Sequence, residues 1–446
     1  MRLSYALVAS LPLLSLLTTT DEADACGGCF VSESESTQVT GHRMVLSISN
    51  EQTTLYDQIQ YSGDPAEFAW VLPIRGQVEI GLSSDALFSL LEQETSITIN
   101  SPFISCPTGS NSCDSASFGS GGSAAGGGSG PGGVEIIAQE VVGPYETVQL
   151  SASDPAALNN WLDEHGFNIP PSIEPIIDAY VADGFDFLAL RLAPGEGVSS
   201  MKPVRVTTPG GAPVLPLRMV AAGTGEKTAI TLWVMAEGRY EPQNFPSFLI
   251  ESNDLVWDWD QSRSNYSDLR AQGLTGNGGL NWLVEAGEEY YGGFYSLLDL
   301  ASYAPLDSGY ADPDGTNAEL NAQADIDVLT HGLENMWINR YSAELPVAGL
   351  ANDLTLQASD DQVAVQRYFD VENAIGTEPT CPTPPPDPCG DDDGSGSGDS
   401  LHDLFTRGNR NSSGCSFDRS TSVPRELPIG ILSLGLALFA RRRRRS

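Results

Sequence analysis

The segment from Met44 to Ile74 constrains the fold more than any other part of this chain. Apolar side chains recur there at every second residue, and clusters of Gly, Asn, Asp and Pro interrupt the runs. Alternation broken by turn-forming residues is typical of antiparallel strands with short connections. The sequence therefore predicts a three-stranded antiparallel meander. The apolar faces of its strands are expected to carry Met44, Leu46 and Ile48; Leu55, Ile59 and Tyr61; and Phe68, Trp70 and Leu72.

Beyond this segment, the apolar period switches between two residues and about 3.6 residues. Helical periodicity predicts helices over 85–94, 154–165 and 171–182; the first is capped by Ser84, and the third ends at Gly184. Strands are predicted over the other apolar runs, at 95–100, 134–142, 145–151, 185–192, 201–207, 215–220 and 229–235. The predicted fold class is α+β, with a largely antiparallel sheet and a small helical layer.

Residues 240–293 are predicted to be rich in loops. They contain a group of large aromatic residues: Trp257, Trp259, Tyr266, Trp282, Tyr290 and Tyr291. Such a group can form a platform for a carbohydrate or a peptide, or it can pack as core beneath a sheet edge. We favour core packing.

The N-terminus has the pattern of a Sec signal peptide. Met1 and Arg2 form a short basic region, Tyr5–Leu17 is apolar, and Ala23-Asp24-Ala25 fits a cleavage site, so cleavage is expected after Ala25. The alternative is a lipoprotein signal with Cys26 as the lipidated residue. That signal requires a Leu-like residue at position 23 and a small residue at position 24.

The C-terminus has the pattern of a membrane anchor. Residues 427–440 are apolar and uncharged, and five arginines, Arg441–Arg445, follow at once. As a helix this stretch would be about 21 Å long, shorter than the ~30 Å hydrocarbon core of a bilayer. Snorkelling arginines and local thinning can close such a gap. The positive-inside rule then predicts that the arginine run stays in the cytoplasm and that the body is exported. The membrane is therefore an expected partner, bound through the C-terminal tail.

The expected domain organisation follows from these ends and from composition. Residues 1–25 form the signal peptide, and 26–375 form the exported body. Within the body, residues 119–133 are almost pure Gly, Ser and Ala, which predicts a flexible insertion. Residues 376–423 are rich in Pro, Asp, Gly and Ser and predict a disordered stalk. Residues 424–446 form the hydrophobic C-terminal helix and its arginine run.

Seven cysteines suit an exported, oxidised protein. Three close pairs are disulfide candidates, and local pairing is expected, although six cysteines allow fifteen connectivities. The pairs are Cys26 with Cys29, Cys106 with Cys113, and Cys381 with Cys389. The Cys26-Gly27-Gly28-Cys29 motif also leaves open a redox dithiol or part of a zinc site, but neither a helix start nor paired histidines accompany it.

The charge is strongly acidic, with 59 acidic against 22 basic residues and a formal net charge of −37. Such a surface repels nucleic acids and anionic lipid headgroups, so no nucleic-acid partner is expected. It favours solubility and leaves cation binding as an alternative. Asp312–Asn317 has oxygen ligands suited to calcium but lacks the EF-hand spacing, so we interpret it as a turn before a helix starting near Ala318.

No catalytic motif is present in the sequence. The four histidines, His42, His165, His331 and His402, lie outside any H-E-x-x-H pattern, and neither G-x-S-x-G nor a phosphate-binding loop occurs. We therefore assign no catalytic residues, metal ligands or cofactors. The favoured hypothesis is a non-catalytic structural or binding module of the cell envelope. The alternatives are an exported hydrolase with a non-local site and a redox protein using Cys26 and Cys29.

Several motifs resemble a bacterial family catalogued as domain of unknown function 2330. The motifs, in chain order, are Cys26-Gly27-Gly28, Gln58-x-Gln60-Tyr61-x-Gly63, Phe68-Ala69-Trp70-Val71-Leu72-Pro73, Val142-Gly143-Pro144-Tyr145-Glu146, Trp161-Leu162-x-x-x-Gly166-Phe167-x-Ile169-Pro170 and Phe187-x-Ala189-Leu190-Arg191-Leu192. The likeness covers roughly residues 25–370, and Leu345–Gln357 resembles the closing segment of the family. It implies a fold and an exported habitat, but no activity.

The tail resembles the MYXO-CTERM sorting signal of myxobacteria. The likeness rests on Gly414-Cys415-Ser416, a spacer, the apolar stretch and the arginine cluster. It implies that Cys415 is the site of processing and attachment, and that the protein reaches the cell surface.

Overall fold

The computed structural model describes residues 29–31, 38–62, 68–104, 140–151, 158, 164, 173–193, 201–221 and 224–381. The chain divides into two compact units, residues 1–383 and 384–446, and every described residue belongs to the first. The predicted signal peptide, the Gly/Ser-rich insertion, the helix over 154–165 (apart from two isolated positions), most of the stalk and the C-terminal tail lie outside the described residues.

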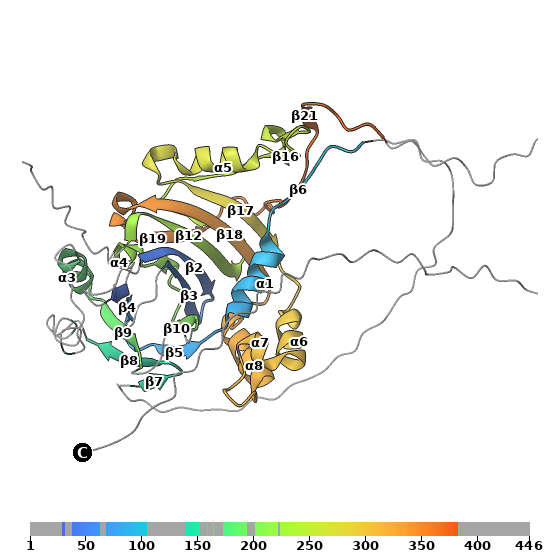
Figure 1. The fold of residues 1–446 in the computed structure, drawn as a ribbon. Helices are drawn as coiled ribbons and strands as arrows, with labels where there is room; N and C mark the ends of the chain where they lie inside the picture. Colours follow the sequence, from blue (N-terminus) through green and yellow to red (C-terminus); the bar gives the residue numbers. More distant parts are fainter. Residues whose placement is uncertain are drawn as a thin grey trace, which may run out of the picture. The chain divides into compact units, whose positions relative to one another are not determined.

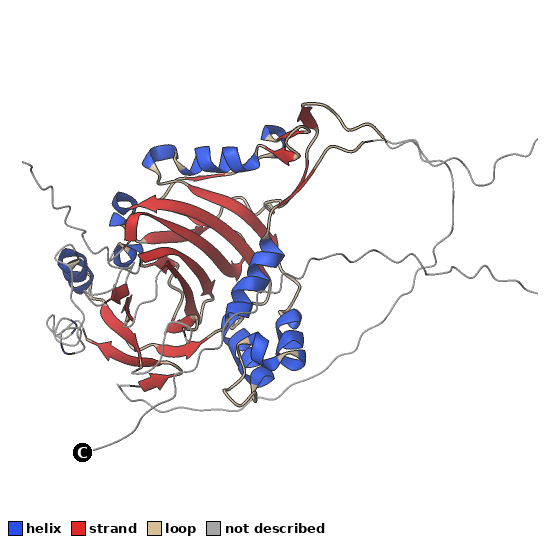
Figure 2. Cartoon of the chain, viewed as in Figure 1, coloured by secondary structure: helices blue, strands red, loops and turns tan. Residues whose placement is uncertain are grey.

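The larger sheet contains eight strands (Figures 1 and 2). In spatial order they are β14 (Ser247–Phe248), β17 (Trp282–Glu289), β18 (Met336–Pro346), β12 (Thr224–Glu237), β2 (Gln38–Ile48), β3 (Gln52–Ser62), β10 (Val204–Pro209) and β5 (Glu79–Leu82). Only the β14–β17 and β12–β2 pairs are parallel. The predicted α+β class with a largely antiparallel sheet is confirmed.

The smaller sheet contains five antiparallel strands. In spatial order they are β1 (Cys29–Val31), β4 (Phe68–Ile74), β9 (Asp186–Leu192), β8 (Tyr145–Leu150) and β7 (Glu140–Val142). The predicted meander is therefore wrong at its third strand. β2 and β3 form the expected hairpin, but β4 crosses into the other sheet. The alternation in β4 does not specify its neighbouring strands, because both faces of β4 are buried. Ala69 and Val71 on one face are buried as fully as Trp70 and Leu72 on the other.

Helices cover the outer faces of the two sheets (Figure 1). The helices are α1 (Asp85–Thr95), α3 (Glu174–Ala182), α4 (Leu217–Val220), α5 (Tyr266–Leu274), α6 (Tyr295–Tyr303), α7 (Pro305–Ser308) and α8 (Ala318–Leu329), with 3-10 turns η2 (Ser252–Asp254), η3 (Gly276–Gly278) and η4 (Val347–Ala351). Three small sheets complete the described part: β11 (Val214–Leu215), β19 (Leu354–Ala358) and β13 (Tyr240–Pro242); β16 (Arg263–Ser264), β15 (Val256–Asp258) and β21 (Asn373–Ile375); β20 (Tyr368–Asp370) and β6 (Thr98–Asn100).

Strand alternation sorts the apolar side chains into two main cores, one on each face of the larger sheet. Met44 and Leu46 of β2 face the smaller sheet and pack in one core with its Trp70 and Leu190. Val45, which lies between them on the chain, faces the opposite way into a core with α1, α6 and α8. A third core joins the outer face of the smaller sheet to α3. The layers are thus helix, sheet, sheet, helix.

The predicted helix over 85–94 is confirmed as α1. Ser84 caps it by accepting a hydrogen bond from the Ala86 amide, and its three predicted leucines, Leu87, Leu90 and Leu91, are buried. α3 confirms the helical part of 171–182, with Ile177 and Tyr180 buried.

Two other expectations need correction. The predicted strand over 215–220 is instead β11 followed by α4. Pro216 stands between them and cannot donate to a sheet ladder, so the strand ends at Leu215. The supposed loop region 240–293 contains α5 and also β17, a strand of the larger sheet. The antiparallel partner of β17 is β18, about fifty residues further along the chain, so no local pattern marks this pairing.

Candidate functional site

The residues of the family-like motifs meet at a cavity of about 390 Å³, which we call the polar cavity. The motif residues in its wall are Gln58, Gln60, Trp70, Tyr145 and Leu190. They come from β3 in the larger sheet and from β4, β8 and β9 in the smaller sheet. Strand β10 begins opposite Asp57, so residues 58–62 of β3 extend beyond it, and the cavity lies at this step.

A buried aspartate in the wall of the polar cavity is paired with a buried histidine behind it. His42 lies on β2 opposite Ile59, and Asp57 lies on β3 opposite Met44, so the two are diagonal neighbours on one sheet face. The His42 Nδ1 atom is 3.0 and 3.1 Å from the two Asp57 carboxylate oxygens. Because an ionised carboxylate can only accept, Nδ1 is the donor.

This pair is incompletely satisfied within the described part of the chain. His42 is 1% exposed and Asp57 is 3% exposed. Among the described residues, the His42 Nε2 atom has no hydrogen-bond partner, and Asp57 accepts from His42 alone. A carboxylate has room for about four hydrogen bonds. Because Asp57 also lines the polar cavity, its remaining acceptor positions are the candidate contacts for a donor on a bound molecule.

The other polar groups of the wall hold one another in place. Arg43 Nη1 donates to Gln58 Oε1 at 3.0 Å, and Gln58 Nε2 donates to Asp85 Oδ1 at 2.6 Å at the start of α1. Arg43 Nη2 also donates to the Phe88 carbonyl at 2.8 Å. Burial lowers the pKa of Arg43, while the charge of Glu92 opposes that shift. The hydrogen bonds from Arg43 and to Asp85 together fix the orientation of the Gln58 amide.

Tyr145 fixes the segment that borders the cavity opposite β3. Its hydroxyl donates to the Lys202 carbonyl at 2.8 Å and accepts from the Lys202 amide at 3.0 Å. The Lys202 ammonium group donates to the Gly309 carbonyl at 2.9 Å. Met201 and Pro203 therefore sit rigidly at the cavity wall beside Trp70.

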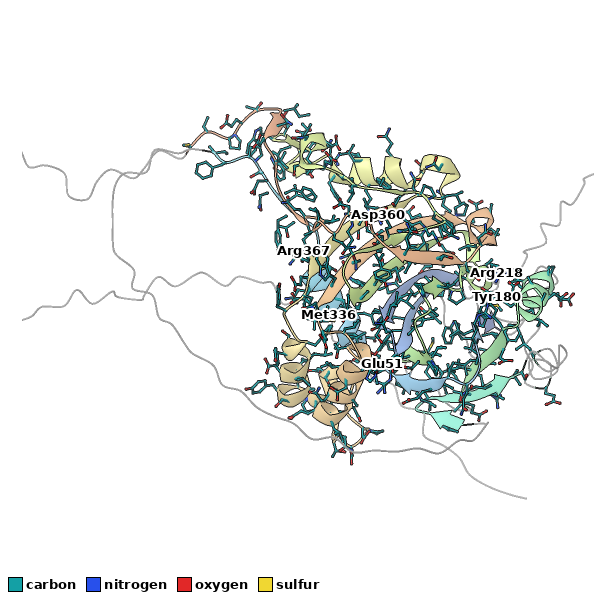
Figure 3. The ribbon with its side chains drawn as sticks, turned by 180° about the vertical axis from the view of Figure 1, so that it is seen from behind. Glu51, Tyr180, Arg218, Met336, Asp360 and Arg367 are labelled. Atoms are coloured by element: carbon teal, nitrogen blue, oxygen red, sulfur yellow. The ribbon has the colours of Figure 1, made fainter. Side chains whose placement is uncertain are left out.

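A second cavity, of about 310 Å³, lies further along the seam between the two sheets; we call it the apolar cavity. Leu46, Leu55, Leu72, Ile74 and Val206 form its buried wall. Its charged lining residues are Arg75, Asp183, Arg218 and Asp353. Figure 3 shows Arg218 beside Tyr180 of α3, and the Arg218 guanidinium carbon is 4.0 Å from the centre of the Tyr180 ring.

A third group of polar residues surrounds Asp325 of α8. Ser83, Tyr310 and Arg205 donate to its carboxylate at 2.6, 2.7 and 2.8 Å. The Tyr56 hydroxyl donates to its backbone carbonyl at 3.2 Å. Burial and the Asp325 charge raise the pKa values of Tyr56 and Tyr310 well above the usual range. Because the carboxylate is fully partnered, this network anchors α8 to the sheet and offers no open binding group.

Most of the site residues expected from sequence cannot be compared with the structure. Ala25, Cys26, Cys106, Cys113, Cys389 and Cys415 lie outside the described residues. Cys29 lies in β1, opposite Trp70, and Cys381 is the last described residue. At least one member of each expected pair is outside the described part, so local disulfide pairing remains a prediction.

The remaining alternatives can be placed within the described ranges. Residues 312–317 form a turn before α8, as expected, with Asn317 donating to Asp312 at 2.5 Å. No group of three or more His, Cys, Asp or Glu suited to a metal ion occurs among the described residues. Trp282 is fully buried, which confirms core packing for that residue, whereas Tyr291 is 80% exposed. Within the described part, every helix is too short or too polar to span a bilayer.

Sequence reasoning missed His42 and Asp57. In the sequence, Asp57 is only a polar residue on the strand face of Leu55, Ile59 and Tyr61, and His42 is only one of four histidines. A polar residue at an inward position of an otherwise apolar strand face was the available signal, and it occurs on both strands of the hairpin. The signal indicates a buried pair, but it does not indicate a cavity beside that pair.

The fold is an α+β body, and residues of the family-like motifs line a cavity between its two sheets. This arrangement defines a class of protein with a candidate binding site. The chain belongs to the family described as "Uncharacterized protein conserved in bacteria (DUF2330)", whose model matches residues 20–304. The segment 345–357 lies beyond this match. No curated protein matches the chain. Among solved structures, the crystal structure of baculovirus P35 shows 10% identity and a TM-score of 0.28, over 47% of this chain and 68% of that one.

Proposed function

We propose that this protein is an exported, surface-anchored binding module of the cell envelope that takes a small polar ligand in the polar cavity. One observation carries the proposal: the buried Asp57 carboxylate, with His42 as its single partner among the described residues, faces a cavity lined by family-motif residues. A concave site in which a few polar groups converge beside apolar side chains is a usual form of a small-molecule site.

The wall indicates the chemistry of the ligand. Asp57 requires O–H or N–H donors, and Trp70 and Leu190 offer apolar surface to a ring or a carbon skeleton. At ~30 Å³ per water molecule, the cavity corresponds to about 13 waters. A monosaccharide, a disaccharide or an amino compound of similar size satisfies these conditions.

The binding experiment is a calorimetric titration of the full mature chain with a panel of mono- and disaccharides and small amines. We expect at least one compound to bind with a stoichiometry of one, and the Asp57→Asn variant to weaken that binding tenfold or more. Lys227→Gln, at an exposed position of β12, is the control and leaves binding unchanged. If a compound binds equally well to wild type and Asp57→Asn, its site is elsewhere and the proposal fails.

The placement at the surface rests on the signal-like N-terminus, the stalk composition and the tail. Fractionation and intact mass of the native protein, beside the Cys415→Ala variant, test it. We expect a chain that begins at Cys26, ends near Cys415 and carries added mass there, and a variant that leaves the surface. An intact arginine tail together with unchanged behaviour of the variant would exclude sorting through Cys415.

The second candidate function is an exported hydrolase, and the His42–Asp57 pair favours it. An aspartate that orients a histidine through Nδ1 leaves Nε2 as a base. Within the described residues, however, no hydroxyl or thiol hydrogen-bonds to Nε2. Turnover of ester, glycoside or peptide substrates that disappears in His42→Gln but persists in His331→Gln would replace the binding proposal with this one.

A further inference from the structure

The apolar cavity is distinct from the polar cavity in wall chemistry. Leu46, Leu55, Leu72 and Val206 form its interior, and each is less than a tenth exposed. The polar side chain of Thr53 is also part of the wall, but it bonds to the Gly210 carbonyl and the Ala212 amide. Two further threonines, Thr208 and Thr355, also belong to the lining. The part formed by the four apolar residues favours a hydrocarbon.

The charged residues of the apolar cavity, which we call its rim, are Arg75, Asp183, Arg218 and Asp353. They differ in how many ionic partners they have. Arg218 binds Asp353 through Nε at 3.0 Å and Nη2 at 2.8 Å, and it binds Asp183 through Nη1 at 3.0 Å. Asp353 also accepts from the Tyr180 hydroxyl at 2.6 Å. Both carboxylates of the rim are thus engaged by the same guanidinium group.

Arg75 is the remaining cation of the rim. It is exposed, its guanidinium carbon lies 3.8 Å from the centre of the Phe185 ring, and its Nη1 donates to the Asp183 carbonyl at 3.4 Å. Among the described arginines, Arg75 alone has no carboxylate within 4.0 Å; ion pairs involve Arg43, Arg191, Arg205, Arg218, Arg239, Arg263, Arg270, Arg340 and Arg367. An arginine without a nearby carboxylate is unusual in a chain of net charge −37.

We propose that the apolar cavity binds an amphipathic carboxylate: a medium-chain fatty acid whose acyl chain occupies the cavity and whose carboxylate pairs with Arg75. The guanidinium fork matches a carboxylate in bidentate geometry. Stacking on Phe185 holds the Arg75 guanidinium group at the mouth of the cavity, so the Arg75 side chain loses little entropy when a ligand binds. A volume of 310 Å³ equals about ten water volumes, which suits a chain of roughly eight to twelve carbons.

The first test is a calorimetric series of straight-chain carboxylates from hexanoate to tetradecanoate, titrated into the full mature chain below their micelle concentrations. We expect a stoichiometry of one and a Kd that tightens about fourfold for each added methylene, the factor that corresponds to ~0.8 kcal/mol per buried CH₂. The gain ends when the cavity is full. Absence of binding at every length, or a gain that continues through tetradecanoate, overturns the proposal.

Two variants locate the ligand. Arg75→Gln, at an exposed position, is expected to weaken decanoate binding about tenfold and to leave decanol binding unchanged. Ala212→Trp, at an exposed position in the cavity lining, is expected to weaken both ligands because it narrows the mouth. Lys227→Gln is the matched charge control. If Arg75→Gln retains the preference for decanoate over decanol, or if Ala212→Trp binds as wild type does, the ligand sits elsewhere.

Discussion

At the scale of single residues, Gly143 shows how a motif position is fixed by packing between the two sheets. Its φ angle is +57°, and a Cβ atom there would lie 2.3 Å from the Leu82 Cδ1 atom. Leu82 belongs to β5 at the edge of the larger sheet, and Gly143 follows β7 of the smaller sheet. The glycine therefore allows the two sheet edges to approach each other, beside the residues that line the polar cavity.

The Gly143→Ala substitution is expected to lower the free energy of unfolding by about 2–3 kcal/mol, through left-handed strain and the clash with Leu82. Gly76→Ala is the matched control, because Gly76 has φ +67° with no atom within 4 Å of the added Cβ. It should cost only the strain, about 1–2 kcal/mol. Urea denaturation measures both, and equal losses would contradict a role for Leu82.

Tyr310 predicts how stability depends on alkaline pH. Burial and the charge of Asp325 raise its pKa in the folded protein above the unfolded value of 10.0. The group therefore stabilises the fold fully below pH 10, and this contribution is lost as pH rises toward the folded pKa. Above pH 10, Tyr310 alone lowers the free energy of unfolding by about 1.4 kcal/mol per pH unit.

The Tyr310→Phe variant is expected to be less stable at pH 8 by about 1–2 kcal/mol, because Asp325 loses a donor. Its stability should then fall less steeply between pH 10 and 11 than that of the wild type. Tyr303→Phe, at an exposed tyrosine, is the control. Parallel stability curves for wild type and Tyr310→Phe above pH 10 would show that Tyr310 ionises equally in both states.

At the scale of elements, α1 could be predicted almost completely. Its cap, its apolar stripe and its starting residue are all encoded within about a dozen residues, and local signals suffice for such a helix. β4 is the opposite case. Its alternation predicts a strand, but the choice between β3 and β9 as neighbour depends on residues more than a hundred positions away.

Ser84 is expected to contribute more to stability than an ordinary helix cap. It accepts from the Ala86 amide and also donates to the Ser308 carbonyl, so Ser84→Ala removes a cap and leaves a buried acceptor unsatisfied. We expect a loss of about 2 kcal/mol in the free energy of unfolding. Ser89→Ala, at an exposed position in the same helix, should change it by less than about 0.5 kcal/mol. Similar losses for both variants would exclude a special role for the cap.

At the scale of the whole described body, one polar cluster ties the helical cover of the smaller sheet to β19 of the small three-stranded sheet. Asp353 lies just before β19, and it accepts from Arg218 of α4 and from Tyr180 of α3. Burial, together with the charge of Asp353, raises the Tyr180 pKa. Three segments far apart in the chain therefore depend on one carboxylate.

Asp353→Asn is expected to lower the free energy of unfolding by about 2 kcal/mol, because Arg218 loses its two-point partner in a half-buried position. Asp360→Asn is the matched control, since Asp360 is exposed and its substitution should be neutral. Hydrogen exchange of α3 amides distinguishes the outcomes: faster exchange in Asp353→Asn alone supports the tie, and unchanged exchange refutes it.

The sequence by itself determined the strand-rich α+β class, the β2–β3 hairpin, and helices α1 and α3, because period, caps and turn residues act over a few neighbouring positions. The export signal and the anchor are likewise local patterns and remain predictions. Only the tertiary structure decided that β4 joins a second sheet, that Asp57 pairs with His42 and lines a cavity, and that Arg75 has no carboxylate partner among the described residues. Each of these depends on contacts between distant segments, and side-chain periodicity carries no information about which distant surface will pack against a given face.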